Sequence, residues 1–189
     1  QNPNVFALPE RVGISFNQNS FLTMPCADSD GWFGVKQVSV IPDNPSRNKP
    51  SVQAWYTLFD TTGTPALACS ATFLTKFRTS AVSAIAANHL ANKDAKTLLV
   101  VGTGSLAPWM AEAHTQVRNY ESILVWGRNA DKADTAAKDI SSRTKHSVTA
   151  VNNVENAIRQ ADVITVATTS RAPIIKGEWL RDGQHLDLV

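Results

Sequence analysis

The feature that most constrains this chain is a glycine turn that separates a buried apolar strand from a helix. Residues 98–101 form a short apolar run of the kind found inside parallel sheets. Gly102, Gly104 and Ala107 follow at the spacing G-x-G-x-x-A. The first glycine permits a tight turn, the second lets backbone N–H groups approach a diphosphate, and the small third residue lets the helix pack on the strand. The helix N-terminus adds unpaired N–H groups and a partial positive charge. The residues predicted to bind the cofactor here are Gly102, Thr103, Gly104, Ser105, Leu106 and Ala107.

The same spacing also occurs in ordinary glycine turns of α/β proteins, but the next strand supports a dinucleotide site. After a predicted helix over residues 105–118 comes a second apolar strand, residues 122–126. A dinucleotide-binding fold places an acidic residue after this strand when it binds the 2′-hydroxyl of NAD. This chain has Arg128 there, with Lys132 one turn into the next helix. Cations favour a 2′-phosphate, so the sequence predicts NADP(H), with NAD(H) as the alternative.

A further apolar strand, residues 162–168, is predicted to end at the ligand edge of the same sheet. Small polar residues follow, namely Thr168, Thr169 and Ser170. Ligands of doubly wound folds bind outside the carboxyl ends of the strands, so these three residues are candidate cofactor contacts. The alternative is that they only close a turn.

Composition excludes several classes of partner. The 189 residues carry a net charge of +2 without a basic stripe, so no nucleic acid is expected. No run of 18 apolar residues and no signal-like segment is present, so no membrane is expected and a cytoplasmic location is the default. Cys26 and Cys69 form no C-x-x-C motif, so neither a metal site nor a disulfide framework is predicted.

The pattern of elements predicts two architectures within an α/β chain. The first part reads as short antiparallel strands over residues 12–16, 21–25, 35–41, 52–59 and 65–68. A helix over residues 72–91 follows, with Leu74, Phe77, Val82, Ile85, Ala86 and Leu90 near helical spacing. From residue 96 onward strands and helices alternate, which predicts a doubly wound parallel sheet. The later elements are expected at residues 130–143, 148–151, 154–160, 162–168 and 185–189, with a loop over 173–180.

The order of these pieces resembles the ornithine cyclodeaminase and mu-crystallin family. The resemblance covers essentially the whole chain. It rests on PER (residues 9–11), MP (24–25), GVK (34–36), IPDN (41–44), LTKFRT (74–79), GTG (102–104) and GQHLDLV (183–189).

The resemblance implies a Rossmann domain and an α/β substrate and dimerisation domain. Residues 1–92 would form the N-terminal part of the substrate domain, and residues 93–189 the NAD(P)-binding domain. The substrate domain would be incomplete here, because the family continues beyond the strand that ends at Val189. A homodimer is expected. The chain departs from the family pattern at Leu106, where glutamine is frequent, and at Pro108; proline is tolerated in the first turn of a helix.

Three cations match family positions that surround the α-carboxylate of the substrate: Arg11, Lys36 and Arg78. Arginine suits a carboxylate because its planar group donates two parallel hydrogen bonds. Lys36 lies within an apolar strand, where a solvated role is unusual, so it is also the candidate catalytic proton donor at the substrate nitrogen. Arg78 could instead be a surface charge on its helix.

Other polar residues are weaker candidates. The family's acidic partner for the substrate nitrogen is expected beyond Val189, so Asp187 is interpreted as structural. Asn44 and Gln53 could line the cleft, although such groups usually bond the backbone first. His114 is expected to be packed or exposed rather than catalytic, and His185 has only its position in its favour.

The resemblance implies hydride transfer between a nicotinamide and a carbon that bears an imine beside a carboxylate. The leading interpretation is an NADPH-dependent reductase of a cyclic ketimine such as Δ1-pyrroline-2-carboxylate or Δ1-piperideine-2-carboxylate. The partner would then be a small cyclic imino acid or amino acid. The alternatives are ornithine cyclodeaminase with bound NAD, an amino acid dehydrogenase acting on alanine, and a non-catalytic ligand binder.

Overall fold

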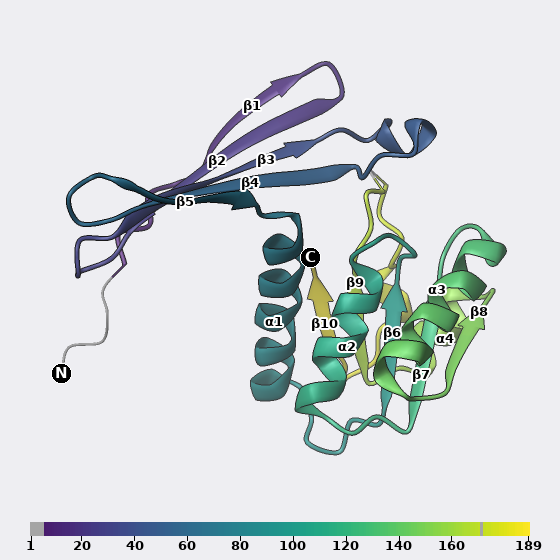
Figure 1. Cartoon of the computed structure of the whole chain (residues 1–189). Coiled ribbons are helices and arrows are strands. Elements are labelled where there is room, and N and C mark those ends of the chain that lie inside the picture. The colour runs from purple at the N-terminus through teal and green to yellow at the C-terminus, as the bar shows by residue number, and fades with distance from the viewer. Residues whose placement is uncertain (1–5, 171) are drawn as a thin grey trace. The chain divides into compact units, whose positions relative to one another are not determined.

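The computed structural model describes residues 6–170 and 172–189. The chain divides into two compact units, Gln1–Thr75 and Lys76–Val189. This division falls within a helix, whereas the family resemblance implies a domain boundary between residues 92 and 93. Each unit has its own sheet (Figure 1).

The first unit is a five-stranded antiparallel sheet whose strands follow one another in chain order. Three of the predicted strands, β2, β3 and β5, are longer than expected, and a single 3₁₀ turn, η1 (Asn44–Arg47), lies between β3 and β4. The first hairpin is tight because Asn17 adopts a left-handed conformation, which asparagine tolerates. The strands are β1 (Val12–Phe16), β2 (Asn19–Ala27), β3 (Phe33–Val40), β4 (Val52–Phe59) and β5 (Pro65–Ser70).

The two faces of this sheet differ. Val38, Ala54 and Ala71 form a small buried cluster on one face, with Leu22 and Met24 packed against it. The opposite face leaves large apolar side chains exposed. These are Val12, Ile14 and Phe16 of β1 and Trp55 of β4, which share one face because Val12, Thr23, Gln37 and Trp55 pair directly across the strands.

The second unit contains a five-stranded parallel sheet in the order β10-β9-β6-β7-β8. The chain runs from β6 outward to β8, returns to the other side of β6 at β9, and ends at β10. This order confirms the doubly wound fold and puts its switch point between β6 and β9. The strands are β6 (Thr97–Val101), β7 (Ser122–Trp126), β8 (Val148–Val151), β9 (Val163–Val166) and β10 (His185–Leu188).

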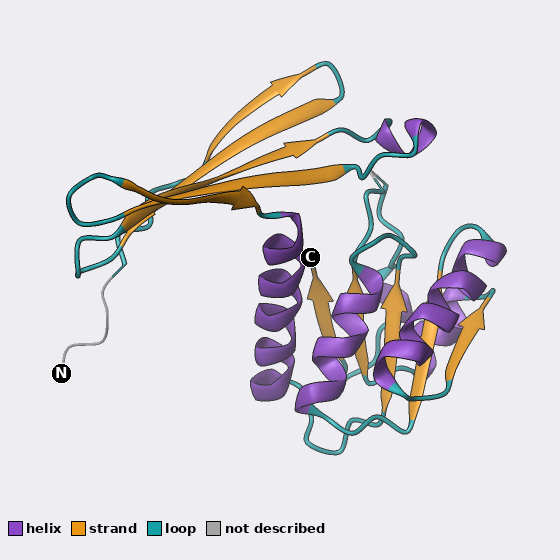
Figure 2. Cartoon of the chain, viewed as in Figure 1, coloured by secondary structure: helices purple, strands orange, loops and turns teal. Residues whose placement is uncertain are grey.

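Helices cover both faces of the parallel sheet (Figure 2). Helices α2 (Ala107–Val117) and α3 (Ala130–Thr144) pack on one face, and α4 (Val154–Gln160) packs on the other. Consecutive residues of β6 alternate between the two cores: Leu98 and Val100 contact the first, Leu99 and Val101 the second. All four are fully buried, as the apolar run predicts. A short 3₁₀ turn, η2 (Gly177–Trp179), interrupts the last loop.

Helix α1 (Thr72–Leu90) was located correctly by its periodicity, but its buried face is not the apolar one. The buried side chains are small: Ser80, Ser83, Ala84 and Ala87. Ala87 belongs to the core shared with α2 and α3, which explains why most of α1 belongs to the second unit. The larger side chains that gave the helical spacing, including Leu74, Phe77, Val82, Ile85 and Leu90, are exposed. No helix in the described part of the chain is long and apolar enough to cross a membrane.

Candidate functional site

The glycine turn has the geometry that a phosphate-binding turn requires. Gly102 has φ +128°, and a Cβ there would collide with the carbonyl oxygen of Ala167 and lie 2.9 Å from its carbonyl carbon. Only glycine fits this position. Among the described residues, no neighbouring atom lies within 4 Å of a Cβ built on Gly104, so the space beside that residue is open in this part of the structure. The protein itself therefore needs glycine at Gly102, whereas at Gly104 the open space admits a ligand to the backbone.

The helix after the turn begins without a side-chain cap. Ala107 is fully buried against β6, as the third position of the motif requires, and Leu106 at the N-cap offers no side-chain hydrogen bond. Pro108 lies within the first turn, where its missing N–H costs nothing. The N-terminus of this helix therefore keeps backbone N–H groups without a side-chain cap, which suits an anionic diphosphate.

The loops after β6, β7 and β9 meet at one edge of the sheet, because the carboxyl ends of parallel strands lie together (Figure 1). The N–H of Gly102 donates to the carbonyl of Trp126 at 2.8 Å, and the N–H of Ala167 donates to the carbonyl of Val101 at 2.9 Å. A Cβ on Gly127, the residue that follows β7, would collide with the Thr103 methyl group. Glycine at this position therefore leaves room for the turn after β6. The structure thus brings the predicted cofactor residues of three separate segments to one edge.

Arg128 and Lys132 lie at the start of α3 and are both exposed. The side chain of Asn129 caps this helix by accepting from the N–H of Lys132 at 2.8 Å, which fixes the chain between the two cations. Within residues 6–170 and 172–189, no carboxylate pairs with either of them. The end of β7 is therefore a positively charged corner of the candidate site.

Thr168, Thr169 and Ser170 follow β9 at the same edge. The hydroxyl of Thr168 accepts from the N–H of Ser170 at 3.2 Å, and the hydroxyl of Ser170 donates to the carbonyl of Ala172 at 2.9 Å. Two of the three side chains therefore hold the turn itself. Thr169 is exposed.

Lys36 and Arg11 belong to the first unit. Lys36 is half-buried in the central strand β3, between Met24 of β2 and Tyr56 of β4. Burial raises the pKa of Tyr56, with a further contribution from Cys26 and Cys69. Lys36 thus shares a partly buried sheet face with apolar and weakly acidic neighbours, and its catalytic role stays a prediction.

Arg11 is exposed and directly precedes β1. The first pair of that strand joins Val12 to Thr23, and the next residue, Met24, pairs with Lys36. Arg11 and Lys36 are thus close in the ladder of one sheet. Arg78 is exposed on α1, in the second unit. The grouping of all three cations around one carboxylate stays a prediction.

The weaker candidates of the first unit have ordinary surroundings. Asn44 is buried and donates from its Nδ2 to the carbonyl of Pro50 at 2.9 Å, so it bonds the backbone as expected. Gln53 lies with Trp55 along a shallow hollow of about 340 Å³ on the sheet face that carries the exposed apolar residues.

A buried polar cluster in the second unit was missed by the sequence reasoning. The hydroxyls of Ser83 and Thr165 both donate to Oδ2 of Asp187, Thr165 at 2.8 Å, and Nε2 of His114 lies 3.1 Å from the Ser83 hydroxyl. Burial raises the pKa of Asp187, but His114, whose Nε2 lies 3.9 Å from Oδ2, and the hydrogen bonds from Ser83 and Thr165 outweigh it and lower the pKa below its usual value. Two features of the sequence could have indicated this cluster: Asp187 lies within an apolar strand, and Ser83 lies on an alanine-rich face of its helix.

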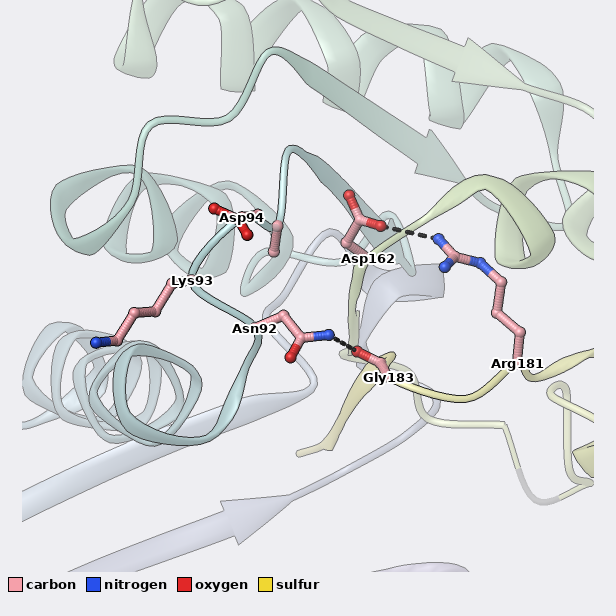
Figure 3. Close-up of a pocket in the computed structure, with 7 residues that line it drawn as sticks. Asn92, Lys93, Asp94, Asp162, Arg181 and Gly183 are labelled. Carbon is pink, nitrogen blue, oxygen red and sulfur yellow. Dashed lines mark hydrogen bonds and ion pairs between the residues drawn. The ribbon is translucent and has the colours of Figure 1, made fainter.

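A hollow of about 400 Å³ lies at the opposite end of the sheet, beside the amino ends of β6 and β9 (Figure 3). Asp162 accepts there from the N–H groups of Lys96 and Thr97, at 2.8 and 3.0 Å, and pairs with Arg181 at 2.8 Å. Burial opposes ionisation of Asp162, but these donors together lower its pKa. Asn92 donates to the carbonyl of Gly183 across the hollow. The polar groups of this hollow thus fasten the sheet to its loops.

No three His, Cys, Asp or Glu side chains in the described residues are grouped so that they could hold a metal ion. His185 lies beside the buried cluster, and burial lowers its pKa further than the nearby Asp187 raises it.

A glycine turn between a parallel strand and a helix at the switch point defines a Rossmann-type dinucleotide-binding fold. The family model described as "Ornithine cyclodeaminase/mu-crystallin family" matches residues 2–189, and the chain belongs to this family.

Three relatives illustrate the match. The Δ1-pyrroline-2-carboxylate reductase of Bacillus cereus is 34% identical over 185 residues, which are 96% of this chain and 57% of the relative. The structure of the Thermococcus litoralis Δ1-pyrroline-2-carboxylate reductase with NADH and L-proline superimposes with a TM-score of 0.94 at 34% identity, covering 97% of this chain and 58% of that chain. An archaeal alanine dehydrogenase dimer with bound NAD gives a TM-score of 0.84 at 30% identity, covering 96% and 56%. The chain thus spans a little more than half the length of these relatives.

Proposed function

We propose that this chain is the cofactor-binding unit and part of the substrate-binding unit of an NAD(P)H-dependent reductase that converts a cyclic ketimine, such as Δ1-pyrroline-2-carboxylate, into the corresponding cyclic amino acid, such as proline. The observation that carries the proposal is the turn at Gly102 and Gly104, with an open space beside Gly104, in a chain whose fold matches a reductase solved with NADH and L-proline. The nicotinamide would supply the hydride.

The turn and the start of α2 would hold the diphosphate. The backbone around Gly104 is open to a ligand, and the uncapped start of α2 offers its partial positive charge to an anion. Thr168 and Ser170 shape the neighbouring loop through their hydrogen bond, and Thr169 adds an exposed hydroxyl group. These residues would orient the cofactor rather than take part in proton transfer.

Arg128 and Lys132 support NADP(H) over NAD(H). Both cations are exposed at the end of β7, where an NAD enzyme of this class carries a carboxylate for the ribose 2′-hydroxyl. A 2′-phosphate bound there would lie near two positive charges and could accept charge-assisted hydrogen bonds from them. The two solved relatives contain NADH and NAD, so the preference for NADP(H) rests on these residues of the present chain.

Arg11, Lys36 and Arg78 are proposed to bind the α-carboxylate, and Lys36 to donate the proton to the ring nitrogen. Lys36 is half-buried beside Met24 and Tyr56, and its ammonium group is the proposed proton donor. Hydride arrives at the carbon and a proton at the nitrogen, so the C=N bond becomes a secondary amine without loss of ammonia.

A homodimer that uses the first unit is part of the proposal. Val12, Ile14, Phe16 and Trp55 expose one apolar face of its sheet, and an apolar patch of this kind marks an association surface. Light scattering of wild-type protein and of an Ile14→Glu variant tests this: the wild type should be dimeric and the variant should dissociate. A monomeric wild type would contradict it.

The function is tested by incubating the protein with Δ1-pyrroline-2-carboxylate and either NADPH or NADH, and by measuring ammonia from L-ornithine in parallel. Oxidation of NADPH with formation of proline and without ammonia supports the reductase. Release of ammonia from ornithine without net consumption of nucleotide would contradict the reductase assignment and indicate a cyclodeaminase. A second candidate is amino acid dehydrogenation, which the likeness to the alanine dehydrogenase favours; NAD reduction by L-alanine would reveal it.

A further inference from the structure

The buried cluster around Asp187 joins four elements of the second unit at one carboxylate. Ser83 comes from α1, His114 from α2, Thr165 from β9 and Asp187 from β10. His114 and Thr165 are fully buried and Ser83 nearly so. No other carboxylate in the described core receives side-chain donors from so many elements. The side chain of Asp187 is 14% exposed and its Oδ2 is already occupied by these donors, so we consider the effect that it has on its neighbours.

The directions of the hydrogen bonds follow from the number of hydrogens. Ser83 and Thr165 each have one hydroxyl hydrogen, and both are given to Oδ2 of Asp187. Ser83 must therefore accept in its 3.1 Å contact with His114, so Nε2 of the imidazole carries a hydrogen. Nδ1 of His114 is buried and has no partner among the described residues. A buried nitrogen acceptor without a partner costs less than a buried N–H donor without one, so the arrangement with the hydrogen at Nε2 and none at Nδ1 is favoured.

The cluster lies near the ligand edge of the sheet, on the side of the switch point that is formed by β9 and β10. Thr165 is three residues before Thr168, and Asp187 is paired with Thr165 in the ladder of β9 and β10. The adenosine half of a dinucleotide belongs to the other side of the switch point, at the end of β7, where Arg128 lies. The nicotinamide half therefore belongs above β9 and β10.

Strand β10 depends on this cluster for its position. Among the described residues it pairs with β9 alone, so hydrogen bonds from Ser83 and the contact with His114 are what tie it to α1 and α2. Without the carboxylate, Ser83 and Thr165 would lose their common acceptor, and His114, which is bonded to Ser83, would lose its link to β10.

We propose that Asp187, bound directly by Ser83 and Thr165 and linked through Ser83 to His114, is a positioning residue that fixes the ends of β9 and β10 beneath the nicotinamide half of the dinucleotide site, an inference that rests on the proposed function. It makes no contact with the reacting atoms. Its effect is exerted through the loop that begins at Thr168 and through the end of β10.

The test compares two nucleotides that differ only in the nicotinamide. Binding of NADPH and of 2′-phospho-ADP-ribose is measured by calorimetry for wild type and Asp187→Asn. We expect the variant to lose about 3- to 30-fold in NADPH affinity, while its affinity for 2′-phospho-ADP-ribose changes less than about twofold. Asp162→Asn is the matched control, because Asp162 is a hydrogen-bonded carboxylate at the opposite end of the same sheet. It should leave the ratio of the two affinities unchanged.

A second measurement does not depend on catalysis. Long-range ¹H–¹⁵N spectra of the wild type should show the His114 ring protonated at Nε2 and bare at Nδ1. Protonation at Nδ1 alone would overturn the arrangement. If Asp187→Asn does not fold, Ser83→Ala and Thr165→Val each remove one donor and should shift the same ratio by a smaller factor.

The outcomes separate the inference from the proposed function. If wild type binds NADPH and Asp187→Asn weakens both nucleotides equally, or neither, the positioning role is wrong and the proposed function stands. If wild type binds neither nucleotide, both fail. A selective loss of NADPH affinity in Asp187→Asn, absent from Asp162→Asn, supports both.

Discussion

Two glycines of the same turn should respond in opposite ways to the same substitution. Gly102→Ala places a methyl group against the carbonyl of Ala167 in a backbone conformation with φ +128°. The conformation alone costs about 1–3 kcal/mol in a residue other than glycine. Overpacking against rigid backbone adds about 1–3 kcal/mol. The free energy of unfolding should therefore fall by about 2–6 kcal/mol, which is a large part of the stability of an ordinary domain.

Gly104→Ala is the matched control. A methyl group there meets no neighbouring atom of the described chain within 4 Å, and the φ of Gly104 is not in the left-handed region. The free energy of unfolding should change by less than about 1 kcal/mol. Because the methyl group fills the space reserved for a diphosphate, nucleotide affinity should fall by about tenfold or more.

Urea unfolding followed by circular dichroism, together with NADPH fluorescence titration, separates the two effects. Gly102→Ala should unfold at a clearly lower urea concentration than the wild type. Gly104→Ala should unfold with the wild type yet bind NADPH weakly. Equal unfolding midpoints for Gly102→Ala and wild type, or unchanged NADPH binding by Gly104→Ala, would refute this account of the turn.

Three further predictions concern charged residues. Lys36→Met should lower the rate of imine reduction by about 10²- to 10⁴-fold, while NADPH affinity measured by fluorescence stays within about twofold; an unchanged rate would remove Lys36 from the mechanism. Arg128→Asp should weaken NADPH relative to NADH by about tenfold or more in competitive titrations, and an unchanged ratio would show that Arg128 does not contact the 2′-phosphate. Hydrogen bonds hold the folded-state pKa of Asp162 below the unfolded value near 3.8. Its stabilising contribution is therefore present above that value and is lost as pH falls through the folded pKa. Asp162→Asn should flatten the acid side of a plot of unfolding free energy against pH, and a slope identical to that of the wild type would contradict the assignment.

The parallel sheet was predictable because its signals are local. The apolar runs at Leu98 and Ile123 and the glycines between strand and helix each specify their own element. The bounds of β7 and β8 in this sheet agree with those predicted, as do those of β1 and β4 in the antiparallel sheet. Alternation of strands and helices then leaves few topologies, and the doubly wound order follows.

Helix α1 shows where this reasoning fails. Its periodic apolar residues, such as Phe77 and Ile85, identified a helix, but the side that packs on the second unit consists of Ser83, Ala84 and Ala87. Small residues permit close approach without contributing to hydrophobic periodicity. The sequence therefore predicted the helix and not the orientation of its buried face.

The candidate site was predictable in part for a similar reason. The glycine turn and Arg128 follow their strands directly, so the carboxyl edge of the sheet brings them together. The cluster of Ser83, His114, Thr165 and Asp187 spans 104 residues of sequence between Ser83 and Asp187 and has no fixed spacing. Only the packing of α1 and α2 beside β10 brings it together, which no local pattern encodes.

The most direct test of the central proposal follows the hydride. The protein is given NADPH carrying deuterium at C4 of the nicotinamide, on the face that is transferred, together with Δ1-pyrroline-2-carboxylate, and proline is analysed by mass spectrometry and NMR. The proposal predicts one deuterium per proline, located on the α-carbon, with one NADP⁺ formed for each proline. Proline without deuterium in experiments with either labelled face, or no proline at all, would contradict it.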